Sequence, residues 1–233
     1  MKLTAILVFV LCITFAGSTF WVPDFGGFDA DQFPVPQADP PVQPAGYAFA
    51  IWGVIYLWLL IGMGYGVLKR AEDPEWHAMR LPLAVSLAVG SVWLPVAVQS
   101  PVWAGILIWA MLISALYALF RAPASDKPWA LLPVGLYAGW LSAASCVSLG
   151  LLAAGYGYTS ETTAAFAAIF GALVLASAVQ NQLRRGPTYA LAVIWALVAV
   201  VVQNLSSSPT VAALAAGGAA ALAFSAWRTL RAN

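Results

Sequence analysis

The chain has 233 residues and a formal net charge of +1; 62% of the residues are hydrophobic, 8% are charged, and the mean hydropathy is +0.86. Soluble domains carry about 25% charged residues, so this composition excludes a water-soluble fold. The sequence contains no cluster of basic residues of the kind that binds nucleic acid, and we expect no nucleic-acid partner.

Long apolar runs dominate the chain. A membrane-spanning helix needs about 20 mostly apolar residues. Eight such runs follow one another at about residues 3–20, 46–68, 81–99, 102–120, 129–154, 163–180, 188–204 and 210–227. None of them contains Asp, Glu, Lys, Arg or His, and the connections between them are short. The sequence therefore predicts an all-α polytopic membrane protein with about eight transmembrane helices in one bundle.

Charged residues indicate the orientation of this bundle. The ten Lys and Arg residues lie at the ends of the chain or in every second connection: Lys2, Lys69, Arg70, Arg80, Arg121, Lys127, Arg184, Arg185, Arg228 and Arg231. The other connections carry Asp24, Asp29, Asp31, Asp39 and Glu161, and no Lys or Arg. Because cytoplasmic loops collect Lys and Arg, we expect both termini in the cytoplasm, in a bacterial inner membrane.

The first run has a second interpretation. Residues 1–20 contain one Lys, an apolar stretch and then Ala16-Gly17-Ser18, a pattern that also fits a cleavable secretory signal at residues 1–18. Cleavage would leave seven spans with the N-terminus outside. The orientation of every later helix would be unchanged.

The connections differ in character. Residues 21–45 hold six prolines among Asp, Gly and Gln, which favours irregular backbone on the outer side. This segment is either a tether between two spans or a lid over a pocket.

Residues 69–80 (KRAEDPEWHAMR) predict a solvated cytoplasmic connection with His77 at its surface. Ser100-Pro101 and residues 205–209 predict tight turns between antiparallel helices. The last helix is rich in Ala and Gly, which favours close helix packing.

Catalytic chemistry has few candidate groups here. A proton relay needs Asp, Glu or His within the membrane, and a retinal Schiff base needs a lysine within a helix, yet the predicted spans offer neither. Cys12 and Cys146 are isolated, which favours packing roles over a disulfide or metal site. We therefore expect no conventional enzyme activity, no cofactor and no metal.

Aromatic residues remain as the candidate functional groups. Phe49, Trp52 and Tyr56 follow an i, i+3, i+7 spacing, which places them on one helix face. Trp93 lies before a proline in the third run, and Tyr137 and Trp140 lie in the fifth. Three helices would each offer a Trp to a common interior. Flat aromatic walls suit a planar apolar ligand, although the same rings could simply fill helix interfaces.

Three segments carry a family resemblance: PAGYAFAIWGVIY at residues 44–56, GSVWLP at 90–95 and LYAGWLSAASCVS at 136–148. Together they resemble the TspO/translocator-protein family, the tryptophan-rich sensory proteins. The matching residues are Pro44, Gly46, Phe49, Trp52 and Tyr56, then Trp93 and Pro95, then Tyr137, Trp140 and Ser142. The resemblance implies a five-helix unit at residues 1–154, and residues 155–233 would add three further helices with no counterpart in the five-helix family.

The resemblance also implies a function. We expect a receptor or carrier that binds a planar hydrophobic ligand, which is a porphyrin, another tetrapyrrole or a sterol-like molecule. The expected partners besides this ligand are membrane lipids and a second copy of the chain in a homodimer. The expected ligand-binding residues are Tyr47, Phe49, Trp52, Tyr56, Trp93, Tyr137 and Trp140. By family analogy, light-dependent tetrapyrrole breakdown is the enzymatic alternative, and nothing in the spacing demonstrates it.

Several positions depart from the family pattern. Tyr47 replaces the first Trp of the first motif, and Gly90 and Ser148 stand where Asn is expected. These changes remove polar groups that position a ligand in typical members, so the chain resembles an extended, divergent branch.

Two other functions fit the sequence. A different kind of transporter could use the polar residues at helix ends, which are Gln99, Gln180, Asn181, Gln203 and Asn204. Such residues are also typical of hydrated helix ends. An assembly subunit of a membrane complex would be favoured if the small-residue face of the last helix lacked a partner within the chain.

Overall fold

The computed structural model describes residues 1–22 and 25–231, so Pro23 and the acidic Asp24 lie outside the described residues. The described part of the chain contains eight α-helices and no strand. The helices are α1 (Lys2–Gly17), α2 (Ile51–Lys69), α3 (Pro74–Ala97), α4 (Pro101–Arg121), α5 (Leu131–Gly155), α6 (Glu161–Leu183), α7 (Thr188–Asn204) and α8 (Pro209–Arg231). Short 3-10 helices are η1 (Ser18–Phe20), η2 (Ala30–Gln32) and η3 (Gly46–Ala50). The predicted all-α fold is confirmed.

The helices have the length and composition of membrane spans. Seven of those in the described residues are long and apolar enough to cross a membrane. The remaining helix, α7, is apolar and has 17 residues, at the short end of the range of about 17–25 residues for a span. The protein is therefore an integral membrane protein.

The start of α3 differs from the prediction, because the helix begins at Pro74 and not at residue 81. Asp73 caps this helix by accepting a hydrogen bond from the backbone N–H of Glu75 (2.9 Å). An Asp N-cap followed by proline favours helix initiation even in a polar segment. The predicted connection at 69–80 is therefore wrong in its second half, and His77 lies half-buried on a helix.

The predicted tight turn between α3 and α4 is confirmed. Ser100 caps α4, since its Oγ accepts a hydrogen bond from the backbone N–H of Trp103 (3.4 Å). Pro101 occupies the first position of the helix, where its missing N–H is not needed. The two helices then pack along each other, and so do α7 and α8 after their short connection.

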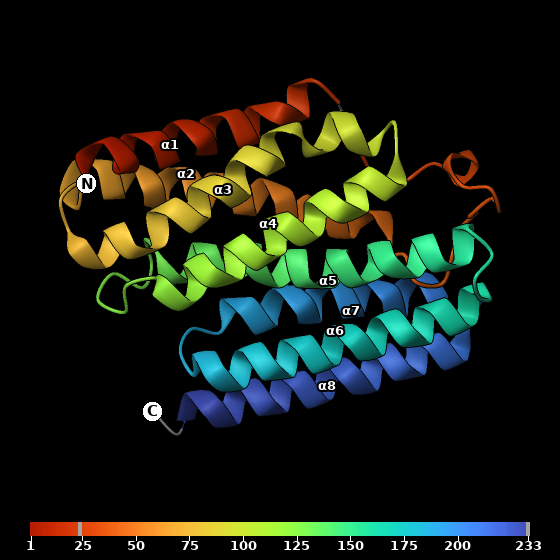
Figure 1. Ribbon diagram of the computed structural model, residues 1–233. Coiled ribbons are helices and arrows are strands. Elements are labelled where there is room, and N and C mark those ends of the chain that lie inside the picture. Colours follow the sequence, from red (N-terminus) through yellow and green to blue (C-terminus); the bar gives the residue numbers. More distant parts are fainter. Residues whose placement is uncertain (23–24, 232–233) are drawn as a thin grey trace.

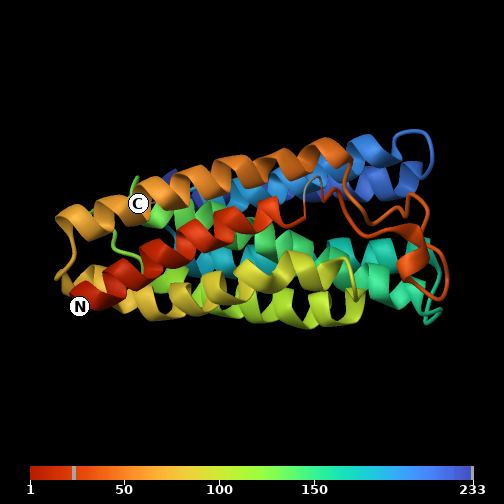
Figure 2. The ribbon, with the colours of Figure 1, turned by 90° about the horizontal axis from the view of Figure 1, so that it is seen from above.

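Helix α5 is the centre of the bundle, with α1 to α4 on one side of it and α6 to α8 on the other (Figures 1 and 2). It packs against α2, α4, α6 and α7. Glycine permits the closest of these approaches. Gly139 on α5 lies against the backbone carbonyl of Tyr189 on α7, and a Cβ atom at residue 139 would collide with that oxygen.

Helix α8 has partners within the chain. It packs against both α6 and α7. Ala212, Ala215 and Ala219 form its buried face, and a Cβ atom at Gly218 would lie 2.5 Å from the side chain of Leu173 on α6. The prediction of a packing helix holds. The other face of α8, with Ala213, Ala216 and Gly217, is exposed, so the alternative of an assembly subunit stays a prediction.

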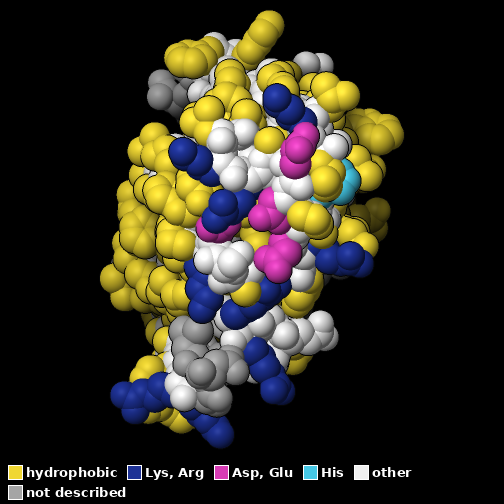
Figure 3. Space-filling view, turned by 90° about the vertical axis from the view of Figure 1, so that its left-hand side faces the viewer, with side chains coloured by type: hydrophobic (Ala, Val, Ile, Leu, Met, Phe, Trp, Pro, Cys, Tyr) yellow, Lys and Arg dark blue, Asp and Glu magenta, His cyan; other side chains and the backbone are white. Residues whose placement is uncertain are grey.

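The basic residues gather at one end of the bundle. Figure 1 places both termini there, together with the α2–α3, α4–α5 and α6–α7 connections. Figure 3 shows this end directly, with Lys and Arg side chains spread across it and acidic side chains between them. We refer to it as the basic end. The opposite end carries residues 21–45 and the α3–α4, α5–α6 and α7–α8 connections.

A buried carboxylate fastens the basic end. Asp126, in the α4–α5 connection, accepts hydrogen bonds from Arg70 Nε (2.7 Å) and from the indole Nε1 of Trp76 (2.9 Å). Arg80 is almost fully buried, and its guanidinium donates to backbone carbonyls near the end of α2, including that of Arg70 (2.6 Å) and that of Ala71 (2.8 Å). The end of α2, the helix α3 and the α4–α5 connection are thus joined at this end of the bundle.

This arrangement predicts a pH dependence of stability. The hydrogen bond from Arg70 holds the pKa of the Asp126 carboxyl below its usual value and outweighs the opposing effect of burial. A carboxyl with a lowered folded-state pKa stabilises the protein above its unfolded pKa, about 3.9, and this stability is lost as the pH falls through the folded value. Asp126→Asn should reduce the free energy of unfolding by about 1.5–3 kcal/mol at neutral pH.

Thermal unfolding in detergent between pH 7 and pH 3 measures this effect. The Asn variant should be less stable at pH 7 and should approach the wild type at acidic pH. Glu72→Gln is the matched control, because Glu72 is exposed in the α2–α3 connection at the same end of the bundle. An Asp126→Asn protein as stable as the control at pH 7 would rule out the fastening role.

Candidate functional site

Residues 21–45, called the outer loop below, cross the end of the bundle opposite to the basic end. Gln32 donates its side-chain amide to the carbonyl of Ala97 at the end of α3 (2.9 Å). The backbone N–H of Val35 donates to the carbonyl of the last residue of α5 (2.8 Å). Asn204, the last residue of α7, donates to the carbonyl of Pro41 (2.8 Å). The loop is therefore attached to the ends of three helices.

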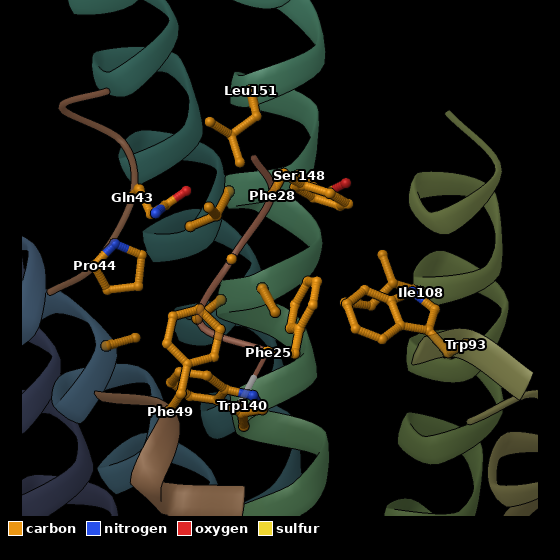
Figure 4. Close-up of a pocket in the computed structure, with 15 residues that line it drawn as sticks. Phe25, Phe28, Gln43, Pro44, Phe49, Trp93, Ile108, Trp140, Ser148 and Leu151 are labelled. Atoms are coloured by element: carbon orange, nitrogen blue, oxygen red, sulfur yellow. The ribbon is translucent and has the colours of Figure 1, made fainter. Parts of the chain in front are cut away.

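A small apolar cavity lies under the outer loop, against α5. Figure 4 shows the rings of Phe25, Phe49, Trp93 and Trp140 arranged around it, with Gln43 and Leu151 farther along its wall. The lining residues are Phe25, Gly27, Phe28, Gln43, Pro44, Phe49, Trp93, Ile108, Trp140, Ala143, Ala144, Val147, Ser148, Leu151 and Ala196. We call this the upper cavity.

A second cavity, the inner cavity, lies among α1 to α5. Its lining residues are Phe15, Thr19, Val22, Phe25, Phe49, Trp52, Tyr56, Gly90, Trp93, Leu94, Ile108, Met111 and Leu141. Four of these, Phe25, Phe49, Trp93 and Ile108, also line the upper cavity. The two cavities are therefore neighbours that share an aromatic wall.

Edge-to-face contacts hold the shared wall. Phe25 of the outer loop meets Trp93 with ring centroids 5.4 Å apart and planes at 85°. Phe49 meets Trp140 at 5.8 Å and 81°. Trp93 is also fixed by its indole N–H, which donates to the carbonyl of Ala104 on α4 (2.9 Å). Aromatic pairs of this geometry contribute about 0.5–1.5 kcal/mol each beyond burial of their surface, so the wall is a rigid surface.

Five of the seven predicted ligand-binding residues line the cavities. Trp52 and Tyr56 stack on each other in the inner cavity, with centroids 5.4 Å apart and planes at 17°. Trp140 lines the upper cavity, and Phe49 and Trp93 line both. The face predicted from the i, i+3, i+7 spacing is thus directed at the interior.

The other two predicted residues lie elsewhere. Tyr137 is fully buried behind the inner cavity, where its hydroxyl shares a hydrogen bond with Ser86 (2.8 Å). Tyr47 is exposed and lies edge-to-face with Trp195 on α7, at 5.5 Å between ring centroids. Neither residue lines the upper or the inner cavity.

Sequence analysis missed the aromatic residues outside the three motifs. Phe25 and Phe28 of the outer loop line the upper cavity, and Phe15 of α1 lines the inner one. The available signal for the loop was the presence of Phe25 and Phe28 in a segment rich in Pro, Gly and Asp. Apolar rings in such a polar segment indicate contact with the rest of the protein. Phe15 stood in an apolar helix without periodicity, and nothing in the sequence distinguished it.

Two of the three departures from the family pattern, Gly90 and Ser148, have different surroundings. At Gly90, a Cβ atom would lie 2.6 Å from the ring of Phe15 and 3.0 Å from Cε of Met111. Phe15 thus fills the space that a larger side chain at residue 90 would need. Ser148 forms part of the upper cavity wall, and its buried Oγ has no hydrogen-bond partner among the described residues.

Charged groups and metal-ligating groups are scarce at this site. The described residues that line the two cavities include no Asp, Glu, Lys, Arg or His. In the described part of the chain, no group of three or more His, Cys, Asp or Glu side chains could hold a metal ion. The lining offers aromatic surface, aliphatic surface and a few hydroxyl and amide groups, which suit binding of an apolar molecule.

Comparison with known families decides the relationship. The family model described as TSPO-like protein matches residues 3–227. The chain belongs to this TSPO-like family. The match continues through α6, α7 and α8, so it covers the predicted five-helix unit and the three helices that follow. No curated protein and no solved structure matches the chain.

The Gly90 contact yields a prediction. Gly90→Ala should destabilise the protein by about 1–3 kcal/mol through overpacking against Phe15, although alanine is the better helix former. Gly53→Ala is the control, because a Cβ atom there would meet nothing within 4 Å; it should be neutral or stabilising by up to about 1 kcal/mol.

Thermal unfolding of both variants in the same detergent measures the difference. Combining Gly90→Ala with Phe15→Leu should recover part of the lost stability, because the smaller side chain leaves room for the added methyl group. Equal stability of the Gly90 and Gly53 variants would show that Phe15 does not occupy this space.

Proposed function

We propose that this TSPO-like protein is a membrane receptor or carrier that binds a planar hydrophobic ligand, a tetrapyrrole or a sterol-like molecule, in the cavities under the outer loop. The observation that carries the proposal is the shared wall, in which Phe25, Phe49 and Trp93 separate two apolar cavities. Small-molecule sites have mostly apolar linings with a few polar groups, and the linings of both cavities have this character.

The geometry of the rings supports a flat ligand. Trp52 and Tyr56 present parallel faces, and Trp140 lies edge-on to Trp52 with centroids 6.2 Å apart. Such walls contact a planar molecule on its faces and at its edge. Phe25 and Phe28 belong to the outer loop, so a ligand in the upper cavity would contact the loop directly. This contact supports a regulatory or transport role, because binding would change the restraint on the loop.

Binding without conventional catalysis is the chemistry that we propose. General acid–base catalysis needs a positioned titratable group, and the lining lacks carboxylates, lysines and imidazoles among the described residues. The distribution of Lys and Arg supports an orientation with the basic end in the cytoplasm of a bacterial cell.

Two of the polar helix-end residues named for a transporter of another kind have hydrogen-bond partners within the chain. Asn204 is fully buried and donates two hydrogen bonds, to the carbonyl of Pro41 and to that of Val200, each at 2.8 Å. It attaches the outer loop to α7, so it is not the hydrated helix end that its sequence position suggested. Gln99 is exposed and bonds to the carbonyl of Pro95 on its own helix (3.0 Å).

Titration with a porphyrin tests the proposal. Protoporphyrin IX dimethyl ester should quench tryptophan fluorescence saturably at low micromolar concentration. The Trp52→Ala/Trp140→Ala double variant should bind at least about tenfold more weakly, as expected from the loss of about 1.4 kcal/mol of aromatic contact. Trp103→Ala is the control, because Trp103 is exposed and lines neither cavity.

The Phe versions of the two tryptophan substitutions keep most of the packing volume, and they serve if the Ala variants do not fold. Thermal unfolding verifies that each variant is folded before titration. Linear, nonsaturable quenching by the wild type, or an unchanged affinity in the double variant, would eliminate the proposed site.

A further inference from the structure

The polar groups at the two cavities are few and uncharged. Outside the indole rings, the polar side chains in the lining are Gln43 and Ser148 in the upper cavity and Thr19 and Tyr56 in the inner one. Among the described lining residues there is no cation. A carboxylate that entered either cavity would lose its hydration without gaining a charged partner, which is strongly unfavourable in an apolar surrounding.

The basic residues are too far away to supply that partner. On α2, Trp52 and Lys69 are separated by about 25 Å of helix, and on α3, Trp93 and Arg80 are separated by about 20 Å. The guanidinium of Arg80 is also engaged with the carbonyls near the end of α2. Every other Lys and Arg lies at the basic end (Figures 1 and 3).

The end of the bundle over the cavities carries acidic side chains. Asp29, Asp31 and Asp39 are exposed on the outer loop, and Glu161 begins α6 at the same end. The sequence has no Lys or Arg in these outer connections. A surface with charge of one sign raises the local concentration of oppositely charged molecules and lowers that of like-charged ones. An anionic ligand would therefore be disfavoured during approach as well as inside.

We infer that the site selects neutral ligands and rejects molecules that carry carboxylates, even when the apolar body of the molecule is the same. The ligand class is a neutral apolar molecule whose polar groups are confined to hydroxyl, carbonyl or ester functions that Gln43 and Ser148 can meet. Ser148 Oγ is buried without a partner among the described residues, and a buried hydroxyl gains from any hydrogen-bonding group brought within reach. This inference rests on the proposed function.

A matched ligand pair tests the selection. Protoporphyrin IX and its dimethyl ester share one ring system and differ in whether the two propionates are free or esterified. Each is titrated into the protein in the same neutral-lipid nanodiscs at pH 7, with tryptophan quenching as the readout. The ester should bind at least tenfold more tightly than the acid.

The acid and the ester also partition into lipid to different extents. A variant that adds a cation to the site separates binding from this difference. Gln43→Lys places an ammonium group at the upper cavity, where the wild-type side chain is half-buried. The ratio of the two dissociation constants should shift at least fivefold toward the acid in this variant. Gln43→Met, of similar length and uncharged, should leave the ratio unchanged. Lipid partitioning cancels in this comparison, because it is the same for every variant.

The exposed carboxylates of the outer loop allow a second measurement, that of the association rate, on residues outside the core. In Asp31→Asn/Asp39→Asn, the association rate of the acid at low ionic strength should rise severalfold, whereas that of the ester should stay the same. If the acid binds as tightly as the ester, or the Lys variant leaves the ratio unchanged, the neutral-ligand inference is wrong while the proposed function stands. If neither porphyrin binds saturably, the proposed function fails for tetrapyrroles and this inference fails with it.

Discussion

The packing of α5 against four other helices is the constraint on which the rest of the structure depends. Close approach to α7 requires the missing side chain of Gly139, which lies against the carbonyl of Tyr189. The same helix carries Trp140 and Ser148 into the upper cavity. Because α5 is held from both sides, the cavity wall that it forms is rigid, and the outer loop can close over it by bonding to helix ends that are already in place.

The two ends of the bundle have separate physical roles. At the basic end, Asp126 of the α4–α5 connection accepts hydrogen bonds from Arg70 and Trp76. Arg80 of α3 donates to backbone carbonyls near the end of α2. At the other end, aromatic residues surround cavities that lack charged lining residues in the described part of the chain. Positive charge is thus kept about 20 Å or more of helix away from the cavities, and the selection of neutral ligands follows from this separation together with the acidic outer connections.

The helices and the orientation of one aromatic face were predictable from the sequence, because both follow from local patterns. Apolar runs located all eight helices, and helical periodicity placed Trp52 and Tyr56 together. Tyr47 was predicted from its place in the motif and not from periodicity; it precedes Trp52 by five residues, a spacing that does not share a helix face, and its ring lies against Trp195 of α7. The start of α3 was missed because hydropathy was given more weight than the Asp73-Pro74 capping signal.

The remaining features depend on contacts between segments distant in the sequence. Tyr137 shares the predicted motif with Trp140, yet Ser86 on α3 binds its hydroxyl and keeps it behind the cavity. Phe15 of α1 occupies the space beside Gly90 of α3, and the sequence of neither helix alone shows this pairing. Phe25 reaches the shared wall only because the outer loop folds back over the bundle. No periodic pattern within one helix encodes these arrangements.

A crystal structure of the protein grown with protoporphyrin IX dimethyl ester tests the central claim most directly. The account predicts the porphyrin ring under the outer loop, in contact with Phe49, Trp93 and Trp140 and covered by Phe25. A porphyrin bound only on the lipid-facing surface of the helices, with these four rings in mutual contact as they are now, would contradict it.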